Sequence, residues 1–157
     1  MINFFKGATE QLRELPGVVS VGAVDYLPFA GPHAGTLVEV EGKPKLAPGQ
    51  ELGTGVCVTD ASYFPTMQIP LKRGRLFTDQ EVAEMRHVVI VNETFARKNL
   101  PGEDPIGKRV TINMKQQDVP SEIIGVVGDN KHKGLDAEIE PMSYWPEDES
   151  QRIALYR

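Results

Sequence analysis

Cysteine is almost absent from this sequence, and that scarcity limits the chemistry of the chain. Cys57 is the only cysteine among 157 residues, so no disulfide forms within one chain. A single thiol is compatible with both the cytosol and the periplasm. It lies in the apolar run Val56 to Thr59, where we expect a buried, unreactive side chain rather than a nucleophile.

Long hydrophobic runs are also missing. No apolar stretch approaches the roughly 20 residues that a membrane-spanning helix needs. The N-terminus, Met1 to Lys6, has only a brief apolar stretch before polar residues, which is unlike a secretory signal peptide. We therefore expect the chain as given to be soluble.

Positive charge is in deficit. The chain has 17 Lys and Arg against 22 Asp and Glu, a net charge of −5. Nucleic-acid-binding proteins usually cluster basic residues, so this balance argues against a nucleic-acid partner. The remaining composition, 40% hydrophobic and 25% charged, is typical of one globular domain or two small subdomains sharing a core.

Catalytic and metal-binding motifs are lacking as well. The G-x-S-x-G turn that exposes a serine nucleophile is not present. His33, His87 and His132 are far apart in the sequence and show no paired metal-ligand spacing. We therefore predict no enzyme activity, no cofactor and no metal site.

One segment imitates a nucleotide-binding motif. Residues 102–108 have the G-x-x-x-x-G-K spacing of a phosphate-binding loop. Arg109 stands where that motif needs Ser or Thr for Mg²⁺, and a strand-like run follows where a helix is required. The sequence therefore predicts a simple turn here.

Short strands and brief helices account for most of the chain. Apolar periodicity predicts helices over 3–15, 61–67 and 93–99. Period-two or short apolar runs predict strands over 18–26, 36–41, 52–59, 87–91, 109–114, 122–127, 142–145 and 153–156, with 109–114 and 122–127 forming a hairpin. The pattern predicts an α+β fold that is mostly strand.

Helix starts carry recognisable capping residues. Asp60 and Asn92 precede predicted helices and have side chains suited to N-caps. Thr78 and Glu81 have the three-residue spacing of a capping box. Nearby, the basic residues of the segment 73–75 are expected to pair with acidic residues of 79–81 rather than bind an anion.

Two Gly-rich loops, 27–35 and 128–134, are the candidate surfaces for partner contact. Leu27 and Phe29 lie in the first loop, and His132 and Lys133 lie in the second. Phe29 has two interpretations, packing into the core, which we favour, or anchoring a partner. The basic run 131–133 is interpreted as a solvated loop in preference to an anion site.

Ten blocks of the sequence, from about residue 12 to residue 146, form a recognisable series when they are taken in order. They are Leu12-Arg13-Glu14-Leu15-Pro16-Gly17-Val18 with Ser20-Val21, Leu27-Pro28-Phe29, Val40-Glu41-Gly42, Val58-Thr59-Asp60-Ala61-Ser62-Tyr63-Phe64, Ile69 to Phe77, Val89 to Ala96, Pro101 to Arg109, Ile124 to Asp129, His132 to Leu135 and Pro141 to Pro146. Together these blocks resemble the MacB-like periplasmic core domain of ABC-transporter permeases of the MacB/FtsX type, especially the acidobacterial-type permeases.

This resemblance implies a porter-like α/β part, formed by 1–35 and 141–157, and a mixed β-rich inserted part, 36–140. It implies a periplasmic domain of an inner-membrane protein, standing between two membrane helices of the same permease. A separate cytoplasmic ABC ATPase would supply ATP hydrolysis, which the domain couples to export or to conformational work on a periplasmic partner or cargo. The family offers no catalytic residues to transfer. The alternative is an extracytoplasmic ligand-sensing domain without catalysis, which would have a closed apolar pocket.

Overall fold

A mixed β-sheet of seven strands organises the molecule, in the order β3-β6-β4-β7-β2-β1-β5. The computed structural model describes residues 2–30, 34–44, 46–84, 86–112 and 119–146. The helices are α1 (Ile2–Arg13), α2 (Tyr63–Thr66), α3 (Asp79–Ala83) and α4 (Glu93–Asn99). The strands are β1 (Gly35–Val40), β2 (Leu52–Thr59), β3 (Leu71–Gly74), β4 (Val88–Asn92), β5 (Arg109–Ile112), β6 (Ser121–Val127) and β7 (Met142–Pro146).

The strand order closes on itself. β5 pairs antiparallel with β1 on one side and with β6 on the other, so six strands form a ring to which β3 is added at one edge of β6. β7 comes last in the chain but lies between β4 and β2, parallel to β2 and antiparallel to β4. The predicted α+β fold and the predicted 109–127 hairpin are confirmed over the described residues.

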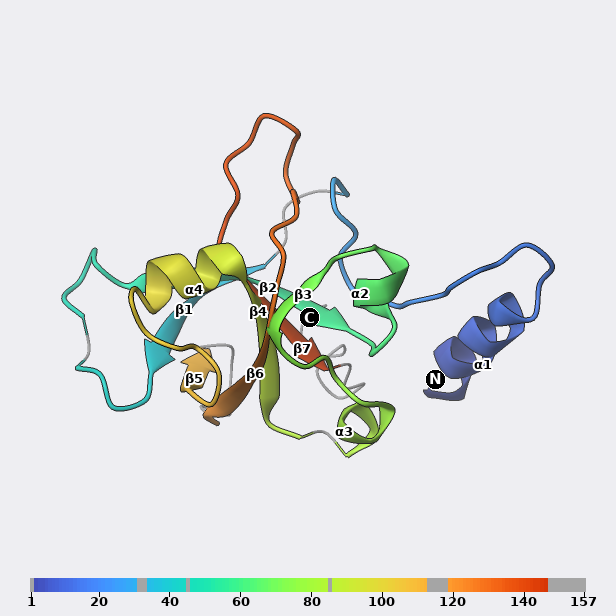
Figure 1. Ribbon diagram of the computed structural model, residues 1–157, viewed down its shortest axis with the longest axis horizontal. Helices are drawn as coiled ribbons and strands as arrows, with labels where there is room; N and C mark the ends of the chain where they lie inside the picture. The colour runs from blue at the N-terminus through green and yellow to red at the C-terminus, as the bar shows by residue number, and fades with distance from the viewer. Residues whose placement is uncertain (1, 31–33, 45, 85, 113–118, 147–157) are drawn as a thin grey trace.

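Alternating side chains give the sheet two apolar faces, because successive residues of a strand point to opposite sides. In β4, Val89 and Val91 pack on one face with Phe95 and Leu100, which belong to α4 and the residue after it. The neighbouring residue Ile90 packs on the other face, with Tyr63 and Phe64 of α2 among others. α4 covers the first face and α2 the second (Figure 1).

Gly125 is required by the close approach of β3 to β6. A Cβ atom at this position would lie 2.3 Å from the backbone oxygen of Arg75. The register between β4 and β6 also shifts beside Gly125, so that Ile124 is the extra residue of a bulge. The missing side chain lets the short edge strand pair with β6.

The predicted strand over 18–26 is wrong. Only Val24 forms a bridge, to Thr59, and the carboxylate of Asp25 accepts a hydrogen bond from Val58 N at 2.8 Å. That carboxylate occupies a position where a regular ladder would use a backbone carbonyl. Val19 is fully exposed, whereas Val24 packs against the core beside the end of β2, so only the last part of the run lies next to a strand.

Other predictions differ from the structure at the ends of elements. β3 was not predicted, and its four residues are all exposed. α2 is shorter than the predicted 61–67, and Asp60 accepts from Ser62 N (3.1 Å) in the turn before that helix. In β1, Val38 and Val40 face the core, whereas Leu37 is 46% exposed.

The capping box of Thr78 and Glu81 and the Asn92 cap of α4 are confirmed. α1 matches the predicted first helix and stands beside the sheet without covering either face (Figure 1). The predicted last strand, 153–156, lies outside the described residues. The division into 1–35 with 141–157 and 36–140 stays a prediction, although β7 shares one sheet with strands of 36–140.

Candidate interaction surface

A hydrogen bond joins the two loops that the sequence offered as contact surfaces. The backbone N–H of Phe29 donates to the carbonyl oxygen of His132 at 2.8 Å. The two loops project from the same end of the sheet (Figure 1). Segments about a hundred positions apart in the sequence therefore form one surface.

Apolar side chains on these loops are exposed. Leu27 is 60% exposed and Phe29 56%, and Leu135, which directly follows the second loop, is 79% exposed. The favoured interpretation of Phe29 as a core residue is therefore wrong. Its backbone φ of 66° lies in the left-handed region, which a residue with a bulky side chain rarely adopts.

His132 is buried, unlike the solvated residue that the sequence suggested. Its side chain lies beside Tyr144, with Nε2 at 3.3 Å from the Tyr144 hydroxyl and 3.0 Å from Asn130 Oδ1. The Tyr144 hydroxyl also donates to Asn130 Oδ1 at 2.9 Å. The imidazole ring of His132 therefore anchors the second loop to β7. Because it is buried, it does not lie on the predicted contact surface.

The lysines beside His132 are engaged within their own loop. Lys133 forms an exposed ion pair with Glu140 at 2.7 Å. Lys131 donates to the carbonyl oxygen of Ala137 at 3.1 Å and also to that of Leu135. These contacts brace the loop that carries Leu135, and they agree with a structural interpretation of the basic run.

The buried thiol and two buried phenols are held in their neutral forms. Burial, with a smaller contribution from the Asp25 carboxylate, raises the pKa of the Cys57 thiol to about 12. Burial likewise raises the pKa values of Tyr63 and Tyr144 above their usual range. A nucleophile needs a lowered pKa or an adjacent base, so these shifts oppose nucleophilic reactivity.

Residues 102–108 form turns leading into β5 rather than a phosphate cradle. Gly102 and Gly107 both have positive φ values. The Lys108 ammonium, which a nucleotide would need, is paired with Glu103 at 2.8 Å. Among the described residues, no three His, Cys, Asp or Glu side chains gather as a metal ion would require.

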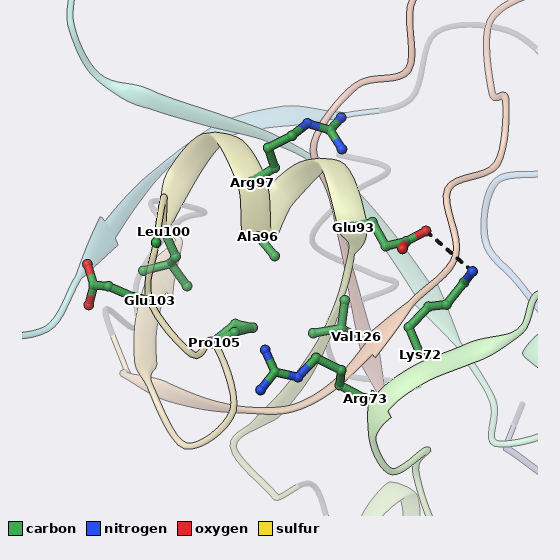
Figure 2. Close-up of a pocket in the computed structure, with 10 residues that line it drawn as sticks. Lys72, Arg73, Glu93, Ala96, Arg97, Leu100, Glu103, Pro105 and Val126 are labelled. Carbon is green, nitrogen blue, oxygen red and sulfur yellow. Dashed lines mark ion pairs between the residues drawn. The ribbon is translucent and has the colours of Figure 1, made fainter.

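A second surface feature was not predicted from the sequence. A solvent-open hollow of about 530 Å³ lies between α4, β3 and the turn that precedes β5 (Figure 2). Residues from four separate segments line it, so no local sequence pattern indicates it. Its lining includes Lys72, Arg73, Glu93, Ala96, Arg97, Leu100, Gly102, Glu103, Pro105 and Val126.

Comparison with known proteins decides the family. Residues 5–153 match the family described as MacB-like periplasmic core domain, which is nearly the whole chain. The chain belongs to this family. None of the helices in the described ranges has the length and apolar character that crossing a bilayer requires.

Two curated relatives of this MacB-like domain are macrolide export ATP-binding/permease proteins named MacB. The protein from Aggregatibacter actinomycetemcomitans is 35% identical over 73 residues, which cover 46% of this chain and 11% of that protein. The protein from Mannheimia succiniciproducens is 35% identical over 69 residues, covering 44% and 10%. The matched region is thus about a tenth of either relative.

Solved structures show the same fold. The periplasmic region of MacB from Actinobacillus actinomycetemcomitans superposes with a TM-score of 0.62 at 22% identity, covering 90% of this chain and 54% of that one. The extracellular domain of the noncanonic ABC-type transporter YknZ from Gram-positive bacteria gives 0.59 at 18% identity, covering 90% and 61%. The MacB-like domain described here therefore spans a little over half of these structures.

Proposed function

We propose that this MacB-like domain is the extracytoplasmic part of an ABC-transporter permease and works without catalysis. In this proposal it stands between two membrane helices of the permease and couples ATP hydrolysis by a cytoplasmic ATPase to export or to work on a periplasmic partner. The family match over residues 5–153 is the observation that carries the proposal. The neutral state of its buried thiol and phenols supports a non-enzymatic role.

The two bonded loops are the surface proposed to transmit that movement. They present Leu27, Phe29 and Leu135 to solvent, while the buried His132 and the Lys133–Glu140 pair hold them in place. Exposed apolar groups on a braced loop bind a partner at low entropic cost. We include Lys133 as a charged contact at the rim of this surface.

A ligand-sensing domain is the second candidate function. Such a domain needs an enclosed, mainly apolar pocket. The hollow beside α4 is open to solvent and has a charged rim, which favours contact with a larger partner.

Membrane topology of the full-length gene product tests the placement. Reporter fusions on both sides of this segment are expected to place it outside the cytoplasm, between two membrane helices. A cytoplasmic location would refute the permease assignment and favour the sensing candidate.

Coupling is tested separately in the full-length transporter, reconstituted with its ATPase. Phe29→Glu is expected to reduce coupled transport or partner-stimulated ATP hydrolysis several-fold, because it places a charge in the apolar contact. Val19→Glu is the matched control, since Val19 is fully exposed and lies outside both loops. Equal loss in the two variants would contradict a role for the loop surface.

A further inference from the structure

The hollow beside α4 combines an apolar floor with a charged rim. Leu100 and Val126 are 1% and 3% exposed, so only a small part of each side chain reaches the floor, beside Ala96 and Pro105. Figure 2 shows these four residues in the middle of the hollow, with the charged residues around them. The apolar part of the hollow is therefore small.

Cations exceed carboxylates around this floor. The charged residues that line the hollow, together with their ion-pair partners, are Lys43, Lys72, Arg73, Arg97, Lys108, Glu93, Glu103 and Asp104. Five cations against three carboxylates leave an excess of two positive charges. The whole chain has a net charge of −5, so this region is opposite in sign to the molecule.

The carboxylates of the rim leave the cations of β3 available. Glu103 is paired with Lys108 and Lys43, and these two contacts lower its pKa to about 2. Lys72 approaches Glu93 only to 3.9 Å, and both side chains are exposed. Arg73 contacts Asp104 at 2.8 Å with both side chains more than half exposed, a type of pair that contributes little and exchanges readily.

We propose that this hollow binds an acidic, extended peptide segment of a partner or cargo protein. One aliphatic side chain of the peptide lies on the floor formed by Ala96, Leu100 and Val126. A neighbouring carboxylate of the peptide contacts Lys72 and Arg73. This site is separate from the loop surface, so its failure and the failure of the proposed coupling function are distinguishable.

Openness of the hollow favours a peptide over a free small molecule. Small-molecule sites usually bury most of the ligand, whereas this hollow is exposed on its outer side. A segment of a larger protein gains the rest of its buried area from the surrounding surface. Charge complementarity then selects acidic segments and weakens binding as salt rises.

Titration of the isotope-labelled 157-residue chain followed by NMR tests the site. The probe is the peptide acetyl-Asp-Leu-Asp-Leu-Asp-amide, and the comparison probes are its lysine-for-aspartate counterpart and octanoate. The acidic peptide is expected to shift the amide signals of Ala96, Leu100 and Val126. The double variant Lys72→Glu/Arg73→Glu is expected to bind it about tenfold more weakly, since two attractions become repulsions.

The matched control is Lys98→Glu/Arg86→Glu. It changes the net charge by the same amount at two exposed positions outside the hollow, one of them on α4. Retained binding by this control and weaker binding in 0.5 M salt support the site. Equal weakening of both variants, equal binding of the lysine peptide, or binding of octanoate without the acidic peptide would overturn it.

Discussion

The guanidinium of Arg75 and the carboxylate of Glu81 form a two-point ion pair, with both nitrogen–oxygen distances at 2.7 Å. Glu81 is buried and is also the third residue of α3, where it completes the capping box that Thr78 begins. Hydrogen bonding to Arg75, followed by contacts with Thr78, holds the pKa of Glu81 at about 2. One carboxylate therefore links the residue following β3 to the start of α3.

Removing this pair is expected to destabilise the fold. Arg75→Ala leaves a buried carboxylate without its cation and should lower the free energy of unfolding by about 1–2 kcal/mol at pH 7. Urea unfolding measures the change. Arg86→Ala, which removes an exposed pair with Glu84, should cost less than about 0.5 kcal/mol. A loss at position 75 no larger than at position 86 would contradict this role.

The same pair predicts a dependence of stability on pH. The pKa of Glu81 is lower in the folded state than in the unfolded state, where it is near 4.5. Its contribution is therefore complete above pH 4.5 and is lost as the pH falls toward 2. The stability difference between wild type and Arg75→Ala should narrow between pH 5 and pH 2. A constant stability difference between pH 5 and pH 2 would show that ionised Glu81 is not stabilised by Arg75.

Gly125→Ala is expected to disturb the edge strand. The new methyl group would lie 2.3 Å from Arg75 O, a backbone atom that cannot move alone, so we expect a loss of about 1–3 kcal/mol. Gly53→Ala is the control, because its nearest neighbour would be 3.9 Å away. Thermal unfolding compares the two variants. Similar melting temperatures of the two variants would contradict this prediction, because they would show that the Arg75 backbone can move away from the new methyl group without loss of stability.

The thiol of Cys57 should resist labelling in the folded protein. With its pKa raised to about 12 and its side chain buried, almost no thiolate is present at pH 8. Ellman's reagent should react slowly with the native chain and rapidly in 6 M guanidinium chloride. Stability should fall as the pH rises above 9, because only the unfolded thiol ionises there. Rapid native labelling would contradict the buried position.

Tyr144→Phe should loosen the second loop. The variant removes the hydroxyl group that contacts both Asn130 and His132, at a cost of about 1 kcal/mol. Relative to wild type, amide hydrogen exchange should become faster in residues 128–134 of the variant and should stay unchanged in β2. A double-mutant cycle with Asn130→Ala measures the coupling energy between Tyr144 and Asn130. A coupling energy near zero would show that their hydrogen bond does not stabilise the loop.

Local signals made much of the fold predictable from sequence. Asn92 marks the start of α4 because its side chain accepts from Phe95 N within the same turn. The strand over 52–59 was predicted with its observed ends because it contains the continuous apolar run Val56 to Val58, which the structure buries. Such features depend on neighbours in the chain, which a single sequence displays.

Features that depend on distant partners were not predictable in this way. The run 18–26 has strand-forming residues, but strand formation also requires continuous pairing with a neighbouring backbone, and only Val24 of this run forms a bridge, to Thr59 at the end of β2. His132 is buried beside Tyr144 and Asn130, and its neighbours in the sequence, Lys131 and Lys133, do not predict this burial. The hollow next to α4 is assembled from four separate segments.

The central position of β7 has a consequence for how the chain reaches its folded state during synthesis. Until residues 142–146 leave the ribosome or a translocation channel, β2 and β4 each have an unpaired edge where β7 will lie. Exposed strand edges invite pairing with other chains. The sheet therefore cannot be completed before its last described strand has been made, and until then β2 and β4 can pair with strands of other chains.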